Sequence, residues 1–197
     1  MNEQQIHNLL YEALQTEQGG IEVYRKALQC AVNSDLKEEW AEYLEQTENH
    51  ERVVLDVFEK LGLDPLQMPP GRKVVEHIGK SLVAAMDLAL KSGDRNAAQV
   101  VAAECVVHAE TKDHQNWELI GQIAKSAKGT MAKVLKAAHD EVEDEEDEHL
   151  YHTAGWCREL SLEALGLAAV LPPPEEEKDV KTAIGAARAK AQREEMI

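Results

Sequence analysis

The stretch "LQTEQGGIEVY" (residues 14–24) carries the pattern that decides the fold. Leu14, Ile21 and Tyr24 recur at the spacing of one face of an α-helix. Glu17 lies in the middle of this apolar stripe. A lone buried carboxylate is costly, so Glu17 is either solvated near a helix end or one member of a larger buried group.

The rest of the sequence predicts an all-α protein. Aromatic residues make up 4% of the 197 residues, and no strand-like alternation of apolar and polar residues occurs. Helical periodicity predicts four long helices and a shorter one between the two pairs, at about residues 3–32, 35–61, 73–91, 94–126 and 129–166. This layout favours a four-helix bundle, residues 1–167, with a long crossover that contains a short helix. Residues 168–197, which contain "LPPP" (171–174), are expected to form a proline-broken C-terminal helical tail.

Charge and cysteine usage narrow the class of protein. The formal net charge of −16 argues against a nucleic-acid partner, because phosphates would be repelled. Cys30, Cys105 and Cys157 are scattered and form no C-x-x-C pair, which fits a reducing compartment. The N-terminus does not resemble a signal peptide, and no apolar run is long enough for a membrane span. The sequence therefore predicts a cytoplasmic protein with no membrane association.

The second long helix carries another inward polar group, within "LEQTENHERVV" (residues 44–54). On a helical wheel Thr47, His50 and Glu51 fall on its apolar side, whereas Gln46 turns outward. An imidazole beside an inward carboxylate is a stronger candidate ligand than a lone buried histidine, which is usually hydrogen-bonded in a core.

The third and fourth long helices repeat this arrangement. In "HAETKDHQNWEL" (residues 108–119) the apolar stripe places Glu110 inward, with Asp113 and His114 on its flanks. The acidic run "EVEDEEDEHLYH" (residues 141–152) is expected to be mostly a solvated face. Two of its members differ, because a Glu-x-x-His pair straddles the apolar line of the helix; these are Glu146 and His149.

An internal repeat links the two halves of the chain. "TEQGGIEVY" (16–24) and "AETKDHQNW" (109–117) each place a glutamate two helical turns before an aromatic residue, and "TENH" (47–50) corresponds to "EDEH" (146–149). Carboxylates that meet in a core repel one another, so protons, cationic side chains or metal ions must compensate them. Carboxylates with one imidazole per ion suit iron, manganese or zinc.

These residues resemble the ferritin-like superfamily, and within it the YciF-type stress-response proteins. The closer likeness lies in "LEQTENHERVVLDVFEKLG" (44–62), in the helix between the two pairs, and in "DRNAAQVVAAECVVHAE" (94–110). The resemblance covers roughly residues 1–160. It implies two divalent metal ions, iron in the first place with manganese or zinc as alternatives, held by Glu17, His50, Glu110, Glu146 and His149.

The sequence departs from the superfamily pattern at Thr47, where many members have a glutamate. Glu51 could replace that ligand, and His114 or Asp113 could complete the set. Tyr24 lies on the stripe of Glu17, and in related proteins such a tyrosine donates an electron or hydrogen-bonds a ligand. The alternative for Tyr24 is a core aromatic with a satisfied hydroxyl.

The resemblance implies an oxidoreductase that reacts with dioxygen or hydrogen peroxide in oxidative-stress defence. A ferroxidase, a peroxidase and a catalase-like enzyme all fit this expectation, and a homo-oligomer, in the first place a dimer, is expected. The alternative is a metal-binding or structural stress protein without turnover. A plain helical bundle with a metal-free hydrogen-bonded network is a third interpretation.

Overall fold

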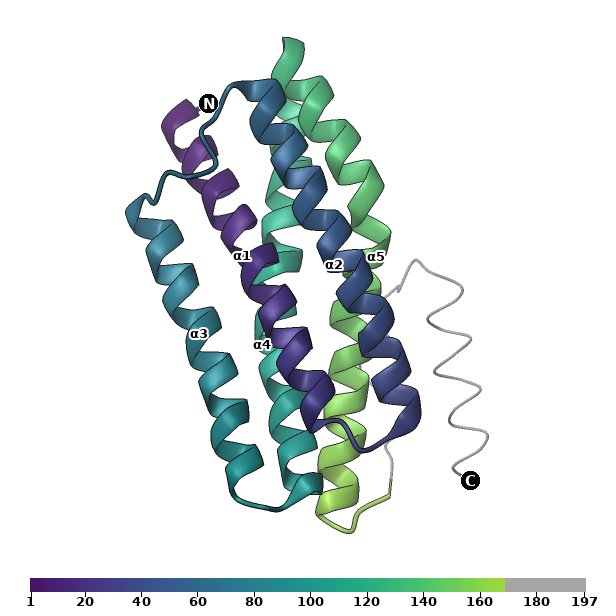
Figure 1. Ribbon diagram of the computed structural model, residues 1–197. Coiled ribbons are helices and arrows are strands. Elements are labelled where there is room, and N and C mark those ends of the chain that lie inside the picture. The colour runs from purple at the N-terminus through teal and green to yellow at the C-terminus, as the bar shows by residue number, and fades with distance from the viewer. Residues whose placement is uncertain (169–197) are drawn as a thin grey trace.

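The structure is a computed structural model, and it describes residues 1–168 (Figure 1). These residues form five long helices and no strand. The helices are α1 (Glu3–Cys30), α2 (Ser34–Leu61), α3 (Pro70–Lys91), α4 (Arg95–Ser126) and α5 (Gly129–Ala164). The prediction of an all-helical bundle is confirmed. The predicted tail, residues 168–197, lies outside the described residues apart from its first one.

Four of the helices pack in a ring, in which α1 and α5 each contact both α2 and α4. The remaining helix, α3, packs on the outside against α1 and α4. Figure 1 shows α3 running along the bundle from the end where α2 finishes to the end where α4 begins, so α2 and α4 point in the same direction. The crossover helix has 22 residues and is the shortest of the five described helices, as the sequence predicts.

Local signals fix most helix ends. The Asn33 side chain accepts hydrogen bonds from the backbone N–H groups of Asp35 and Leu36, which caps the start of α2. Gly62 ends that helix with a φ of 69°, a left-handed conformation that glycine adopts without strain. The first turn of α3 begins at Pro70, about three residues before the predicted start, because proline is tolerated where no intrahelical N–H is needed.

A buried guanidinium anchors the crossover to α1. Arg72 is 5% exposed and donates to the backbone oxygens of Pro65 (2.5 Å) and Gln67 (2.9 Å). It also donates to the side-chain oxygens of Gln15 and Gln18 on α1, at 3.1 Å each. One side chain therefore joins the connecting loop, the start of α3 and the middle of α1.

The apolar core consists of two clusters separated along the bundle. One is built from large residues that include Leu10, Phe58 and Leu135, and the other from residues that include Trp40 and Leu160. On every helix of the ring, the stretch between the two clusters carries buried polar side chains. The polar layer is therefore enclosed by apolar packing at both ends. None of the helices among residues 1–168 is long and apolar enough to cross a membrane.

Candidate metal centre

Six ionisable side chains from the four ring helices meet in the polar layer. Each of them is 3% exposed or less. They are Glu17 on α1, His50 on α2, Glu110 and Asp113 on α4, and Glu146 and His149 on α5. The structure thus brings together the five ligands that the resemblance implies and adds Asp113. Glu17 is not a solvated residue at a helix end.

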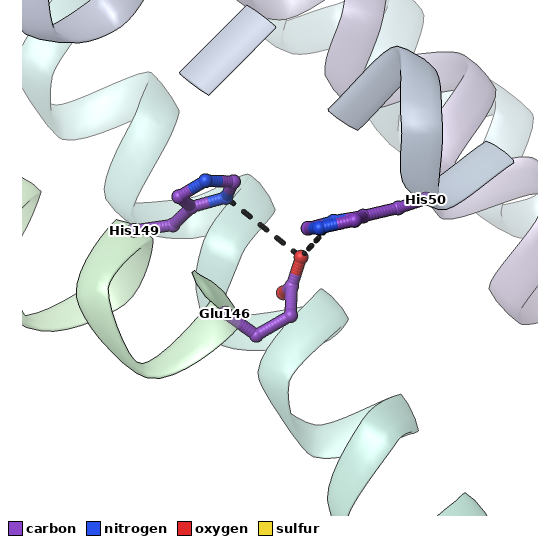
Figure 2. A group of neighbouring side chains, drawn as sticks. All are labelled: His50, Glu146 and His149. Atoms are coloured by element: carbon purple, nitrogen blue, oxygen red, sulfur yellow. Dashed lines mark ion pairs between the residues drawn. The ribbon is translucent and has the colours of Figure 1, made fainter. Parts of the chain in front are cut away.

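Glu146 occupies the centre of this group. Its Oε1 lies 2.8 Å from His50 Nδ1 and 3.7 Å from His149 Nδ1, and Figure 2 shows the carboxylate between the two rings. His50, Glu146 and His149 each offer a ligand atom, and these atoms lie within 4.8 Å of one another. Glu17, Asp113 and Glu146 form a second group with the same spacing, so Glu146 belongs to both.

Each imidazole also faces a carboxylate from a different helix. The Oε2 atom of Glu17 lies 4.0 Å from His50 Nδ1, and the Oε2 atom of Glu110 lies 3.7 Å from His149 Nδ1. Two similar arrangements therefore stand side by side, each with one histidine and one glutamate, and they share Glu146.

Apart from the close contact between Glu146 Oε1 and His50 Nδ1, the atoms that face one another in this layer lack well-formed hydrogen bonds. They are Glu17 Oε2, His50 Nδ1, Glu110 Oε2, Asp113 Oδ1, both carboxylate oxygens of Glu146, and His149 Nδ1. Buried polar atoms in proteins are nearly always paired, and a concentration of unpaired ones points to an ion. Carboxylate oxygens and imidazole nitrogens are ligands for iron, manganese and zinc. The residues present therefore fit divalent cations.

Burial and crowding also raise carboxyl pKa values in the layer. Burial raises the pKa of Glu146 to about 8, and the nearby Glu110 carboxylate adds to the effect. Burial, followed by repulsion from neighbouring carboxylates, raises the pKa values of Glu17 and Asp113 well above their usual range. The raised pKa values favour the protonated carboxyls when no cation is present, and a bound cation would take the place of such protons.

Three further side chains form hydrogen bonds with three of the candidate ligands, on the side away from the centre of the layer. The Nε2 atom of His50 lies 2.7 Å from Glu145 Oε2, and that of His149 lies 2.8 Å from Gln46 Oε1. Trp117 donates from Nε1 to Glu17 Oε1 at 2.9 Å. Gln46 was expected to face outward and Glu145 to belong to the solvated face, so sequence reasoning missed both. The sequence feature that could have identified Gln46 and Glu145 is their equivalent position in the internal repeat, directly before Thr47 and Glu146.

Two candidate ligands lie away from the group. Glu51 is half-buried, accepts a hydrogen bond from Gln18 Nε2 at 2.9 Å, and lines an open cavity of about 510 Å³ along α1 and α2. The side chain of His114 is 17% exposed, and its Nδ1 lies 3.2 Å from Asp147 Oδ1. Between the two alternatives beside Glu110, the structure brings Asp113 into the layer and leaves His114 at its edge.

Thr47 is buried but bonded to its own helix. Its hydroxyl donates to the backbone oxygen of Tyr43 at 2.8 Å. Its methyl group would lie 3.3 Å from a Cβ atom on Gly20, so the glycine permits a close approach of α1 and α2 at this level. No carboxylate comes from position 47, and the additional carboxylate of the layer comes from Asp113 on α4.

Two tyrosines border the layer. Tyr24 is fully buried, and its pKa is raised well above the usual value by burial and then by the charge of the Glu110 carboxylate and a side-chain hydrogen bond with it. Tyr43, which sequence reasoning did not single out, places its ring 4.3 Å from that of His149 and donates to Glu39 Oε1 at 2.7 Å. Tyr24 therefore lies next to Glu110 at the border of the layer.

Together these features define a buried carboxylate and imidazole site that could hold metal ions. Comparison of the chain with protein-family models, with curated proteins and with solved structures finds no match.

Proposed function

We propose that this chain is a ferritin-like dimetal-carboxylate protein that binds two iron or manganese ions and reduces dioxygen or hydrogen peroxide in oxidative-stress defence. The observation that carries the proposal is the convergence of seven buried carboxylate and imidazole atoms from four helices on one layer. A glutamate from each of two helices with Glu-x-x-His on each of the other two is the ligand pattern of di-iron and di-manganese bundles, and this chain departs from it at Thr47.

The ligands divide into two positions. Glu17 and His50 serve one position, Glu110 and His149 serve the other, and Glu146 is shared. Asp113 adds to the side of Glu17, where Thr47 supplies no carboxylate. When bound, redox-active ions at these positions supply the electrons that an oxidant accepts.

The protein's own residues prepare the site for this chemistry. The apolar clusters on either side exclude bulk water, which strengthens every electrostatic interaction inside. Contacts from Glu145 and Gln46 fix the two rings so that their Nδ1 atoms face the layer. The protons held by Glu17, Asp113 and Glu146 leave as cations enter, so the buried charge stays balanced.

Metal binding is the first test. The purified full chain is loaded anaerobically with Fe(II) or Mn(II), desalted and subjected to elemental analysis, and two ions per chain are expected. Bound metal well below one ion per chain would contradict the proposal and support a metal-free hydrogen-bonded network.

Turnover is the second test. Stopped-flow mixing of the ferrous protein with dioxygen or hydrogen peroxide should give an optical transient that Glu110→Ala abolishes. Glu104→Ala is the matched control, because Glu104 lies on the same helix but is exposed. Stoichiometric metal without any transient would favour the non-catalytic alternative, a metal-binding or structural stress protein.

A further inference from the structure

The two histidines of the layer are held by a crossed pair of contacts. His50 on α2 is held by Glu145 on α5, and His149 on α5 is held by Gln46 on α2. The two contacts are nearly equal in length, 2.7 Å and 2.8 Å, and both use the Nε2 atom of the ring. Gln46 and Glu145 occupy equivalent places in the internal repeat, so they perform the same task for opposite rings.

Both contacts leave the inner nitrogen of the ring available. An acceptor oxygen at Nε2 favours the tautomer with hydrogen on that atom, which leaves the lone pair of Nδ1 free to bind a cation. The Nδ1 atoms of His50 and His149 are buried and face the layer, where they lie 2.8 Å and 3.7 Å from Glu146 Oε1. The rings are therefore oriented alike.

The two side chains that contact the rings, Glu145 and Gln46, differ in charge. Glu145 offers a carboxylate and Gln46 a neutral amide, and a carboxylate behind an imidazole makes the opposite nitrogen a stronger metal ligand. The number of nearby carboxylates also differs between the two histidines. Three lie on the side of His50, namely Glu17, Asp113 and Glu146, and two lie beside His149, namely Glu110 and Glu146.

We propose, on the basis of the dimetal function above, that Glu145 and Gln46 are positioning residues that make the two metal positions unequal. The position at His50 binds its ion more tightly and fills first, and the position at His149 fills second. The protein therefore has a one-metal state in which the single ion lies beside His50.

Two single substitutions, one at Glu145 and one at Gln46, test this inference. Glu145→Gln places an amide behind both rings, and Gln46→Glu places a carboxylate behind both. Both residues are half-buried and neither offers an atom to the layer, so the fold should tolerate the changes. Glu141→Gln is the control, because Glu141 lies on the same helix and pairs on the surface with Arg52.

Calorimetric titration of the full chain with Mn(II) measures the two steps. The unaltered protein should bind in two resolved steps. Glu145→Gln should weaken the first step by about 10- to 100-fold, the range found when such supports are lost, and Gln46→Glu should strengthen the second. Crystals with one equivalent of Mn(II) should show anomalous density beside His50 and not beside His149.

Several outcomes would overturn the inference. They are a first ion beside His149, an ion divided evenly between the positions, a single ion bound by both histidines, and support variants whose two steps match those of the unaltered protein. These results leave the dimetal proposal standing if two ions still bind. A failure of the unaltered protein and of every variant to bind Mn(II) or Fe(II) overturns the dimetal proposal together with this inference.

Discussion

At the scale of single residues, Glu146 contributes to how the stability of the metal-free protein depends on pH. Its pKa is raised to about 8, mainly by burial, so the folded state holds a proton that the unfolded chain has already lost. The free energy of unfolding therefore falls as pH rises from the ordinary carboxyl range towards 8. One such group contributes a slope of up to about 1.4 kcal/mol per pH unit.

Glu146→Gln should remove this contribution, because the amide does not titrate. In the presence of a chelator, the variant should lose less stability than the unaltered protein between about pH 5 and pH 8. Urea unfolding at several pH values measures the difference. Equal slopes for the two proteins would show that the Glu146 carboxyl is not protonated in the folded state.

The choice between Asp113 and His114 gives a second prediction. Asp113 is 3% exposed and belongs to a group of ligand atoms, whereas His114 contacts Asp147 at the edge of the layer. Asp113→Asn should weaken metal binding by about tenfold or more, since even outer supports carry an effect of that size. His114→Gln should leave the affinity nearly unchanged in the same titration. The reverse order would assign the ligand to His114.

At the scale of helices, the sequence was informative where local chemistry determines an end. The caps at Asn33 and Gly62 are side-chain and backbone signals, so the bounds of α2 could be predicted closely. The start of α3 could not, because Pro69 and Pro70 indicate a connection, yet proline also suits a first helical turn. Whether α3 spans the bundle depends on its packing against α1 and α4, which periodicity does not report.

The candidate site was predictable to the precision of a helical wheel. Glu17, Glu110 and Glu146 lie on or beside the predicted apolar stripes, and the structure brings them together. The wheel did not decide between neighbours such as Asp113 and His114, because the first half of α4 is apolar nearly all round. Contacts that reach across to another helix, such as those of Gln46 and Glu145, depend on how α2 and α5 pack, which the wheel does not contain.

The anchor at Arg72 gives a prediction at this scale. Arg72→Met removes four hydrogen bonds that join the crossover to α1, and it leaves partly buried acceptors unpaired. The free energy of unfolding should fall by roughly 2–3 kcal/mol. Arg25→Met is the control, because Arg25 is half-exposed and its ion pairs with Glu22 and Glu48 lie on the surface. The control should cost less than about 1 kcal/mol, and equal losses would contradict a special role for Arg72.

At the scale of the whole molecule, the proposed ligands tie four helices to one point. A cation that binds the folded state and not the unfolded chain adds about 2.7 kcal/mol of stability at a free concentration 100 times its dissociation constant. Mn(II) should therefore raise the melting temperature of the full chain, and Glu110→Gln should reduce the rise. Differential scanning calorimetry with and without a chelator measures the effect.

Amide hydrogen exchange should show which helices the bound metal stabilises. Amides in the middle of α1, α2, α4 and α5 should exchange more slowly with metal, because each of these helices supplies a ligand. The central amides of α3 should change least, because this helix supplies none. Uniform protection of all five helices would indicate that the metal acts on global unfolding alone.

The hydrogen bond between Trp117 and Glu17 gives the protein an optical probe of its own. The indole nitrogen lies 2.9 Å from a carboxylate of the proposed site, so a paramagnetic ion bound there would quench the fluorescence of this ring at short range. Occupancy beside Glu17 can then be followed in real time without an added dye. Trp117→Phe would remove the responsive emission and leave that of Trp40 and Trp156, the other two tryptophans of the chain.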